Sequence, residues 1–127
     1  MEKNLRSAIA VLSRLFIITA LTVNFAQADA LQVTASSSES NLYGPANAMD
    51  GNHQSRWSSV FEDPQWLIVD LGEQKDVAGI SIGWEAAFGK SYEVQLSDDK
   101  SSWKTVFETS ESDGGTDEVY FRKAPAR

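Results

Sequence analysis

The chain has 127 residues, no cysteine, and 18 acidic against 11 basic residues, which gives a formal net charge of −7 at neutral pH. An acidic surface repels phosphates and anionic lipid head groups, so this balance argues against nucleic acids and membrane surfaces as partners. The absence of cysteine excludes a disulfide-stabilised scaffold and leaves a metal ion as a way to brace a small domain.

Residues 1–30 have the pattern of an export signal. Basic residues accompany two apolar runs, and small residues follow in an A-x-A arrangement that ends at Ala28 or at Ala30. The apolar runs are shorter than the about 20 residues of a membrane-spanning helix, which favours a cleaved signal peptide over a membrane anchor. We therefore expect a mature domain of residues 31–127 that is secreted or periplasmic, with no membrane insertion after cleavage.

The remaining sequence predicts an all-β domain. Short apolar segments alternate with turn residues, without an internal repeat or a helical period, which is typical of an antiparallel sandwich or barrel. Residues 36–47 form an expected Ser-rich loop, residues 72–76 an expected turn, and residues 123–127 show no closing strand. The strands are expected, in chain order, at 31–35, 65–71, 78–84, 91–97, 103–107 and 119–121.

Two strand patterns indicate what each face contacts. The segment 65–71 is apolar on both faces, which predicts a central strand covered on both sides. In the segment 91–97, Tyr92, Val94 and Leu96 alternate with polar residues, so these three side chains are expected to point into the core. The tryptophans within strand patterns are expected to face the core and not a ligand: Trp66, Trp84 and Trp103.

Several strings, in order and at consistent spacing, carry a family resemblance. They are ASSSES (35–40), PANAMDGN (45–52), SRWSS (55–59), DPQWLIVDLG (63–72) and SYEVQLSDD (91–99), followed by Trp103. Over residues 33–127 the chain resembles discoidin or F5/8 type C domains, and within them the bacterial family 32 carbohydrate-binding modules. The resemblance implies a galactose-binding-like antiparallel β-sandwich of jelly-roll type, incomplete at its C-terminal strands.

The same resemblance implies a structural calcium ion at the Met49-Asp50-Gly51 turn. The matching positions are the side chain of Asp50, the carbonyls of Asn47 and Asn52, and the carbonyl and hydroxyl of Ser55. Small oxygen-bearing residues around a permissive glycine suit a cation that prefers several oxygen ligands. On the residues alone, a simple Asx turn is the alternative interpretation.

Saccharide recognition in this family uses loops at one end of the sandwich. It needs a ring face to stack on the sugar and polar side chains to bind its hydroxyls. Three candidates have a structural alternative: Tyr43 as a cover of the core edge, Arg56 as a brace for the calcium loop, and His53 as an exposed turn residue. The candidate ligand-binding residues are Glu39, Tyr43, His53, Arg56, Phe61 and Glu62.

The chain is therefore predicted to be a non-catalytic carbohydrate-binding module that recognises a neutral or cationic polysaccharide. Such a module normally tethers the catalytic domain of a longer parent protein to its substrate. Catalysis lacks support, because paired carboxylates need a cleft and Asp70 and Glu93 are expected on strand or turn surfaces. No Ser-His-Asp order surrounds the single histidine. The alternatives are a discoidin-like adhesion domain that binds protein or lipid head groups, and a nonfunctional fragment.

Overall fold

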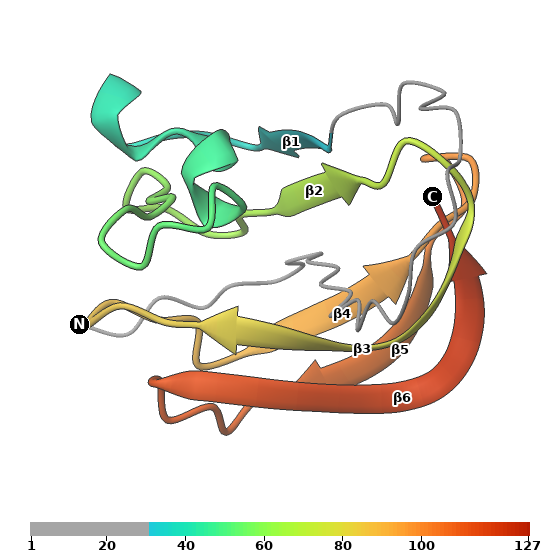
Figure 1. Ribbon diagram of the computed structural model, residues 1–127. Coiled ribbons are helices and arrows are strands. Elements are labelled where there is room, and N and C mark those ends of the chain that lie inside the picture. The colour runs from blue at the N-terminus through green and yellow to red at the C-terminus, as the bar shows by residue number, and fades with distance from the viewer. Residues whose placement is uncertain (1–30) are drawn as a thin grey trace, which may run out of the picture.

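The computed structural model describes residues 31–127, which form six β-strands and two short 3-10 helices (Figure 1). The predicted signal peptide, residues 1–30, lies outside the described residues. The strands are β1 (Gln32–Ala35), β2 (Leu67–Asp70), β3 (Lys75–Gly83), β4 (Tyr92–Leu96), β5 (Lys104–Thr109) and β6 (Thr116–Ala126), and the helices are η1 (Asn41–Tyr43) and η2 (Pro45–Ala48). Over residues 31–127, no helix is long and apolar enough to cross a membrane.

The strands pair as three antiparallel two-stranded sheets: β1 with β2, β3 with β6, and β4 with β5. In Figure 1, β1 and β2 form an upper layer above the other four strands. The β3–β6 ladder has an irregularity between Val77 and Gly79, and the β4–β5 ladder has one between Val94 and Gln95. The predicted all-β antiparallel fold is confirmed.

Apolar side chains form two clusters, of which only the first includes residues of β2, and Val106 and Phe121 pack against both of them. The first cluster contains Leu67, Val69, Leu71, Val77, Leu96 and Ala126. The second contains Ile80, Tyr92, Val94 and Val119. Tyr92, Val94 and Leu96 are all buried, so the period-two alternation in this segment correctly identified its core face.

Some strand boundaries differ from the prediction. β3 begins at Lys75, inside the expected turn, because Lys75 pairs with Ala126 at the far end of β6. β6 runs through Pro125 to Ala126, where the sequence pattern shows no strand; proline is tolerated in a strand that has a free edge, where no N–H is required. Among the described residues β2 pairs with β1 alone, so the expected central position of this strand is wrong. The expected loop 36–47 contains η1 and all of η2 except its last residue, Ala48.

Trp66 points outward, contrary to the prediction, and is 38% exposed. Its neighbours Gln65 and Leu67 are both buried, so alternation places the intervening tryptophan on the outer face. Its backbone is held there by Ser36, whose N–H donates to the Trp66 carbonyl at 3.0 Å and whose hydroxyl accepts from the Trp66 N–H at 3.0 Å. Trp57 and Trp103 pack against the first cluster, and Trp84 packs against the second.

Three long loops gather at one end of the molecule, on the left of Figure 1, and we call this the loop end: residues 36–66, 84–91 and 110–115. The second and third loops are joined by two backbone hydrogen bonds. The Trp84 N–H donates to the Gly115 carbonyl at 2.7 Å, and the Ser112 N–H donates to the Lys90 carbonyl at 3.1 Å. The opposite end carries the turns 71–74 and 97–103 and the C-terminus.

Candidate functional site

A buried amide organises the longest loop of the loop end. Gln65 is 4% exposed, and its Oε1 accepts hydrogen bonds from the hydroxyls of Ser36 and Ser37, the second at 2.6 Å. Its Nε2 donates to the Glu62 carbonyl at 2.9 Å, while the Ser37 hydroxyl accepts from the Val60 N–H at 3.2 Å. These bonds connect the beginning of the loop to its end, so the intervening residues are held as a closed unit.

Within this loop the structure brings Glu39, Tyr43 and Arg56 together. The Glu39 N–H donates to the Ser58 carbonyl at 2.7 Å, and the Ser58 N–H donates to the Tyr43 carbonyl at 3.2 Å. The guanidinium carbon of Arg56 lies 4.2 Å from the centroid of the Tyr43 ring, which is a cation–π contact. Both side chains are half-buried. One face of the Tyr43 ring is therefore occupied by Arg56, and the two side chains form a single stacked unit.

The other three candidates are exposed residues of the same loop. His53 lies in the turn between Asp50 and Ser55, as expected for a turn residue. Phe61 is 59% exposed, a large fraction for a phenylalanine. Glu62 is also exposed, and its N–H donates to the Val60 carbonyl at 2.9 Å. All three residues are exposed at the surface.

The turn at Asp50 gathers three of the four predicted calcium positions. One carboxylate oxygen of Asp50 accepts from the Asn52 N–H at 2.8 Å, and the other accepts from the Ser55 hydroxyl at 2.6 Å. The Ser55 hydroxyl also lies 2.8 Å from the Asn52 carbonyl. Gly51 has a φ of 75°, which permits the tight reversal. Hydrogen bonds from Ser55 and from the Asn52 backbone hold the pKa of Asp50 below its usual range.

The donor set of this turn fits a calcium ion. A carboxylate, a main-chain carbonyl and a hydroxyl are hard oxygen ligands of the kind that calcium prefers. Within residues 31–127 no group of three or more His, Cys, Asp or Glu side chains could hold a metal, so a cation at this turn depends on carbonyl and hydroxyl oxygens beside the single carboxylate of Asp50. The side chain of Asn47 makes different contacts: its amide nitrogen donates to two backbone carbonyls.

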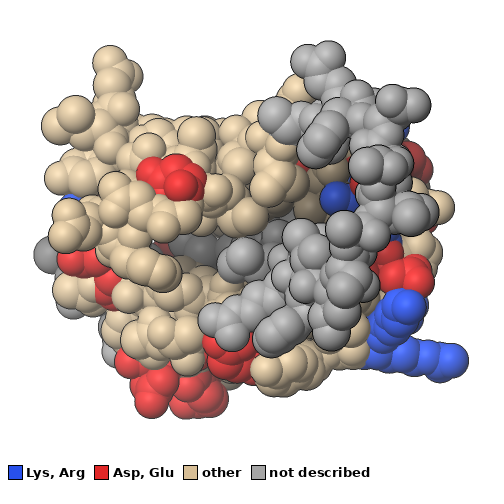
Figure 2. Space-filling view, viewed as in Figure 1, with Lys and Arg blue, Asp and Glu red and all other residues tan. Residues whose placement is uncertain are grey.

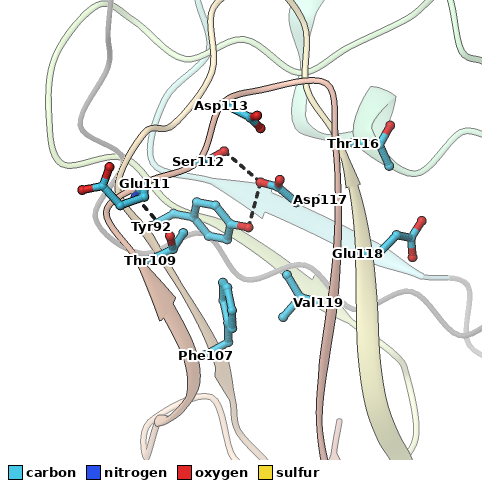
Figure 3. A pocket seen from close by; sticks show the side chains of 10 residues that line it. All are labelled: Tyr92, Phe107, Thr109, Glu111, Ser112, Asp113, Thr116, Asp117, Glu118 and Val119. Carbon is cyan, nitrogen blue, oxygen red and sulfur yellow. Dashed lines mark hydrogen bonds between the residues drawn. The ribbon is translucent and has the colours of Figure 1, made fainter.

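A cavity of about 220 Å³ opens where β4, β5 and β6 meet the third loop (Figure 3). Its apolar wall is formed by Tyr92, Phe107 and Val119. Polar and acidic side chains complete the lining: Thr109, Glu111, Ser112, Asp113, Thr116, Asp117 and Glu118. Sequence patterns did not indicate this cavity, because its residues come from separate strands.

Asp117 is the acceptor that organises this cavity. Its Oδ2 accepts from Trp84 Nε1 at 2.7 Å, from the Tyr92 hydroxyl at 2.9 Å and from the Ser112 hydroxyl at 2.9 Å; Figure 3 shows the last two bonds. Burial, followed by the hydrogen bond to Asp117, raises the pKa of Tyr92. Since one carboxylate oxygen already receives three donors, we assign Asp117 a structural role in fixing the third loop.

Comparison with known protein families resolves the identity of this fold. The family model of the F5/8 type C domain matches residues 32–127, which is almost all of the described chain. The chain belongs to the F5/8 type C domain family. The resemblance seen in the sequence is thereby confirmed.

Solved structures with the same fold include chitosan-binding modules. This F5/8 type C domain is 38% identical to chitosan-binding module 1 of a chitosanase/glucanase from Paenibacillus sp. IK-5, with a TM-score of 0.73 and coverage of 76% of each chain. It is 32% identical to chitosan-binding module 2 of that enzyme in complex with chitotriose, with a TM-score of 0.72, covering 75% of this chain and 76% of the module. The domain thus spans about three quarters of the length of these modules.

Two further relatives are more distant or much longer. CpGH89CBM32-5 from Clostridium perfringens, in complex with GalNAc-β-1,3-galactose, is 20% identical with a TM-score of 0.69, covers 76% of this chain and 78% of its own, and supports the fold alone. The polysaccharide lyase 8 family protein HylA of Enterococcus faecalis is 38% identical over 68 residues, which is 54% of this chain. The matched segment spans 5% of the length of HylA.

The loop end of this F5/8 type C domain is strongly acidic. Its three loops contain seven acidic residues and two basic ones, Arg56 and Lys90. Figure 2 shows Asp and Glu side chains gathered at the lower left, over the start of β6, while Lys and Arg side chains project at the opposite end of that strand. The electrostatic field at the loop end therefore attracts cations and repels anions.

Proposed function

We propose that this domain binds a cationic polysaccharide of the chitosan class at its loop end. The observation that carries the proposal is the combination of an acidic loop end with an exposed Phe61 and the stacked pair of Tyr43 and Arg56. The two modules that share 32% and 38% of its sequence are chitosan-binding modules, which supports the same ligand class. The domain is a binding module and not a catalytic domain.

The proposed recognition divides the work between charge and ring contacts. The carboxylates of Glu39 and Glu62 are exposed and would pair with protonated amines of the polymer. Phe61 would offer an apolar face to the pyranose ring. Arg56 would donate to sugar hydroxyls while its own position is held by the Tyr43 ring. Because these contacts are shallow, affinity for a short oligosaccharide should be weak and affinity for the repeating polymer stronger.

The domain would act by localisation. The chitosan-binding relatives are parts of a chitosanase/glucanase, and one curated relative is a polysaccharide lyase. A binding domain joined to such an enzyme raises the effective concentration of the polymer at the catalytic domain. The export signal predicted for residues 1–30 would bring the domain outside the cytoplasm, where such polymers occur.

We also propose that calcium braces the Asp50 turn in the working domain. The Asp50 carboxylate, the Asn52 carbonyl and the Ser55 hydroxyl supply the ligands, and the carbonyl of Asn47 is the fourth predicted position. Arg56 directly follows Ser55 in the chain, so a braced turn would also restrain the saccharide site. The ion would supply cross-linking of oxygen ligands and no chemistry.

The test of the proposed function is retardation of the purified full chain in gels that contain dissolved chitosan, β-glucan or galactan, at a pH below neutral where chitosan is protonated. We expect retardation by chitosan that weakens with added salt. Glu39→Gln and Phe61→Ala should each reduce it, whereas Tyr120→Ala, which removes an aromatic ring 79% exposed on β6, should not. Equal retardation by all three polymers, or none by chitosan, would reject the cationic ligand class.

Binding to anionic vesicles tests the discoidin-like alternative. The acidic loop end disfavours it, because lipid head groups of the same sign would be repelled. Vesicle binding without retention on any polysaccharide would replace our proposal by that alternative.

A further inference from the structure

One side-chain amide joins the two backbone segments that carry the stacked pair. Asn47 lies in η2, and its Nδ2 donates to the Leu42 carbonyl at 2.8 Å and to the Arg56 carbonyl at 3.1 Å. Leu42 immediately precedes Tyr43, so the two acceptors belong to the backbones on either side of the Tyr43 and Arg56 contact. The Asn47 side chain is therefore a bridge between the two halves of that contact.

The bridge is chemically specific to an amide. A primary amide provides two N–H donors from one nitrogen, whereas a carboxylate provides none and a hydroxyl provides one. Both acceptors are carbonyl oxygens, so a carboxylate at this position would face two further acceptors. Local backbone bonds hold Asn47 itself in place, because its N–H donates to the Gly44 carbonyl at 3.2 Å and η2 is closed by the bond from Met49 to Ala46 at 3.1 Å.

The bridge spans the backbone segments that carry the stacked pair. The guanidinium of Arg56 lies 4.2 Å from the Tyr43 centroid, a contact that fixes two flexible side chains only if their backbones keep a constant separation. The Tyr43 backbone makes two further bonds: its carbonyl accepts from the Ser58 N–H at 3.2 Å, and its N–H donates to the Ser40 carbonyl at 3.1 Å. Asn47 is the group that holds the Arg56 backbone and the residue beside Tyr43 at the same time.

We propose that Asn47 is a positioning residue for the saccharide site, whose amide presets the stacked Tyr43 and Arg56 without touching the ligand. The proposal rests on the function proposed above. When this pair is already ordered in the free protein, binding does not cost the conformational entropy of ordering it, and the affinity is higher. The role belongs to the side-chain amide and is separate from the carbonyl oxygen of Asn47, which is the predicted calcium ligand.

The test compares Asn47→Ala with Asn41→Ala in the full chain. Asn41 is an exposed asparagine of η1, two residues before Tyr43, and serves as the matched control. Two quantities are measured: the chitotriose dissociation constant by calorimetry, and the proton shifts of the Arg56 side chain by NMR, since the Tyr43 ring current displaces them upfield. A thermal melt of each variant shows whether it folds.

Asn47→Ala is expected to weaken chitotriose binding by about 3- to 10-fold, the range set by ordering one or two side chains, and to return the Arg56 shifts toward ordinary values. Asn41→Ala should change neither quantity. Asn47→Ser keeps a small polar turn residue but loses the two-donor amide, so it should behave like Asn47→Ala. If Asn47→Ala does not unfold cooperatively, Asn47→Ser takes its place in the comparison.

The outcomes separate this inference from the proposed function. Unchanged Arg56 shifts and unchanged affinity in a folded Asn47 variant would overturn the positioning role while the proposed function stands. If the wild-type chain binds no chitotriose, the proposed function fails, and the Arg56 shifts still decide whether Asn47 sets the geometry of the pair.

Discussion

Asp70 at the end of β2 and Lys100 in the turn after β4 form an ion pair that links two of the three sheets. Arg127, which immediately follows β6, places its Nε 3.8 Å from the same carboxylate, so Asp70 connects all three sheets at the end opposite the loops. Asp70 is 8% exposed, which corrects the expectation that it lies at the surface. The Lys100 ammonium, and then the Gly72 N–H, hold the pKa of Asp70 below its usual range.

Asp70→Asn should destabilise the domain at neutral pH and lose that effect in acid. A carboxyl group whose pKa is lowered in the folded state stabilises the fold at pH values above 3.8, its pKa in the unfolded chain. This contribution is lost as the pH falls through the pKa of the folded state. Since both partners are half-exposed, we expect a loss of about 1 kcal/mol. Urea unfolding at pH 7 and at pH 3 measures it. If Asp70→Asn lowered the free energy of unfolding equally at pH 7 and pH 3, or if the exposed control Asp113→Asn lowered it as much, the stabilising role of the Asp70 ion pair would be contradicted.

Gly79→Ala should destabilise the β3–β6 sheet, whereas Gly83→Ala in the same strand should not. A Cβ at Gly79 would lie 2.7 Å from the Val119 carbonyl oxygen and 3.2 Å from the Tyr120 ring, while a Cβ at Gly83 would meet no heavy atom within 4 Å. We expect a loss of about 1–3 kcal/mol at position 79 from overpacking. At position 83 we expect a gain of up to about 1 kcal/mol from reduced freedom of the unfolded chain. Thermal melts of both variants provide the comparison, and equal melting temperatures would disprove the steric argument.

Asp117→Ala should be among the more destabilising substitutions at the loop end. It leaves Trp84, Tyr92 and Ser112 without the oxygen that all three donate to, and unsatisfied partners of this kind cost about 1–3 kcal/mol each when buried. Since Tyr92 is buried whereas Trp84 and Ser112 are only partly buried, a total of about 2–4 kcal/mol is expected. Asp117→Asn keeps one acceptor oxygen and should lose less. Glu118→Ala, at the exposed next position, is the control, and tryptophan fluorescence during urea unfolding reports the midpoints. Similar midpoints for Asp117→Ala and Glu118→Ala would argue against the structural role.

Calcium should raise the melting temperature of the wild-type chain, and Asp50→Ala should remove this response. A ligand that binds only the folded state stabilises it by about 2.7 kcal/mol at a concentration 100 times its dissociation constant. Magnesium should have a smaller effect, because it requires a tighter octahedral site than this turn of carbonyls and hydroxyls offers. Calorimetric melts with chelator, calcium and magnesium make the comparison, with His53→Ala as the control in the same turn. A calcium response that survives in Asp50→Ala would place the ion elsewhere.

Local patterns predicted the elements that depend on local chemistry. The alternation of Tyr92, Val94 and Leu96 identified the core face of β4, and the turn signals located most of the strand breaks. The Asp50 turn also follows from local chemistry, because a short carboxylate beside a glycine closes on the next few residues. Side-chain alternation did not predict the orientation of Trp66, because a segment that is apolar on both faces does not reveal which face the sheet leaves exposed.

The sequence by itself determined the all-β class, the F5/8 type C family, the acidic character and the loop that carries the candidate ligands. Tertiary structure alone decided which of these candidates meet, because the Tyr43 and Arg56 contact and the Asn47 bridge depend on how the loop closes on the buried Gln65. It also decided that Asp70 is buried, through partners 30 and 57 residues later in the chain. Side-chain alternation is a property of neighbouring residues, whereas a contact between distant segments depends on the packing of the whole domain.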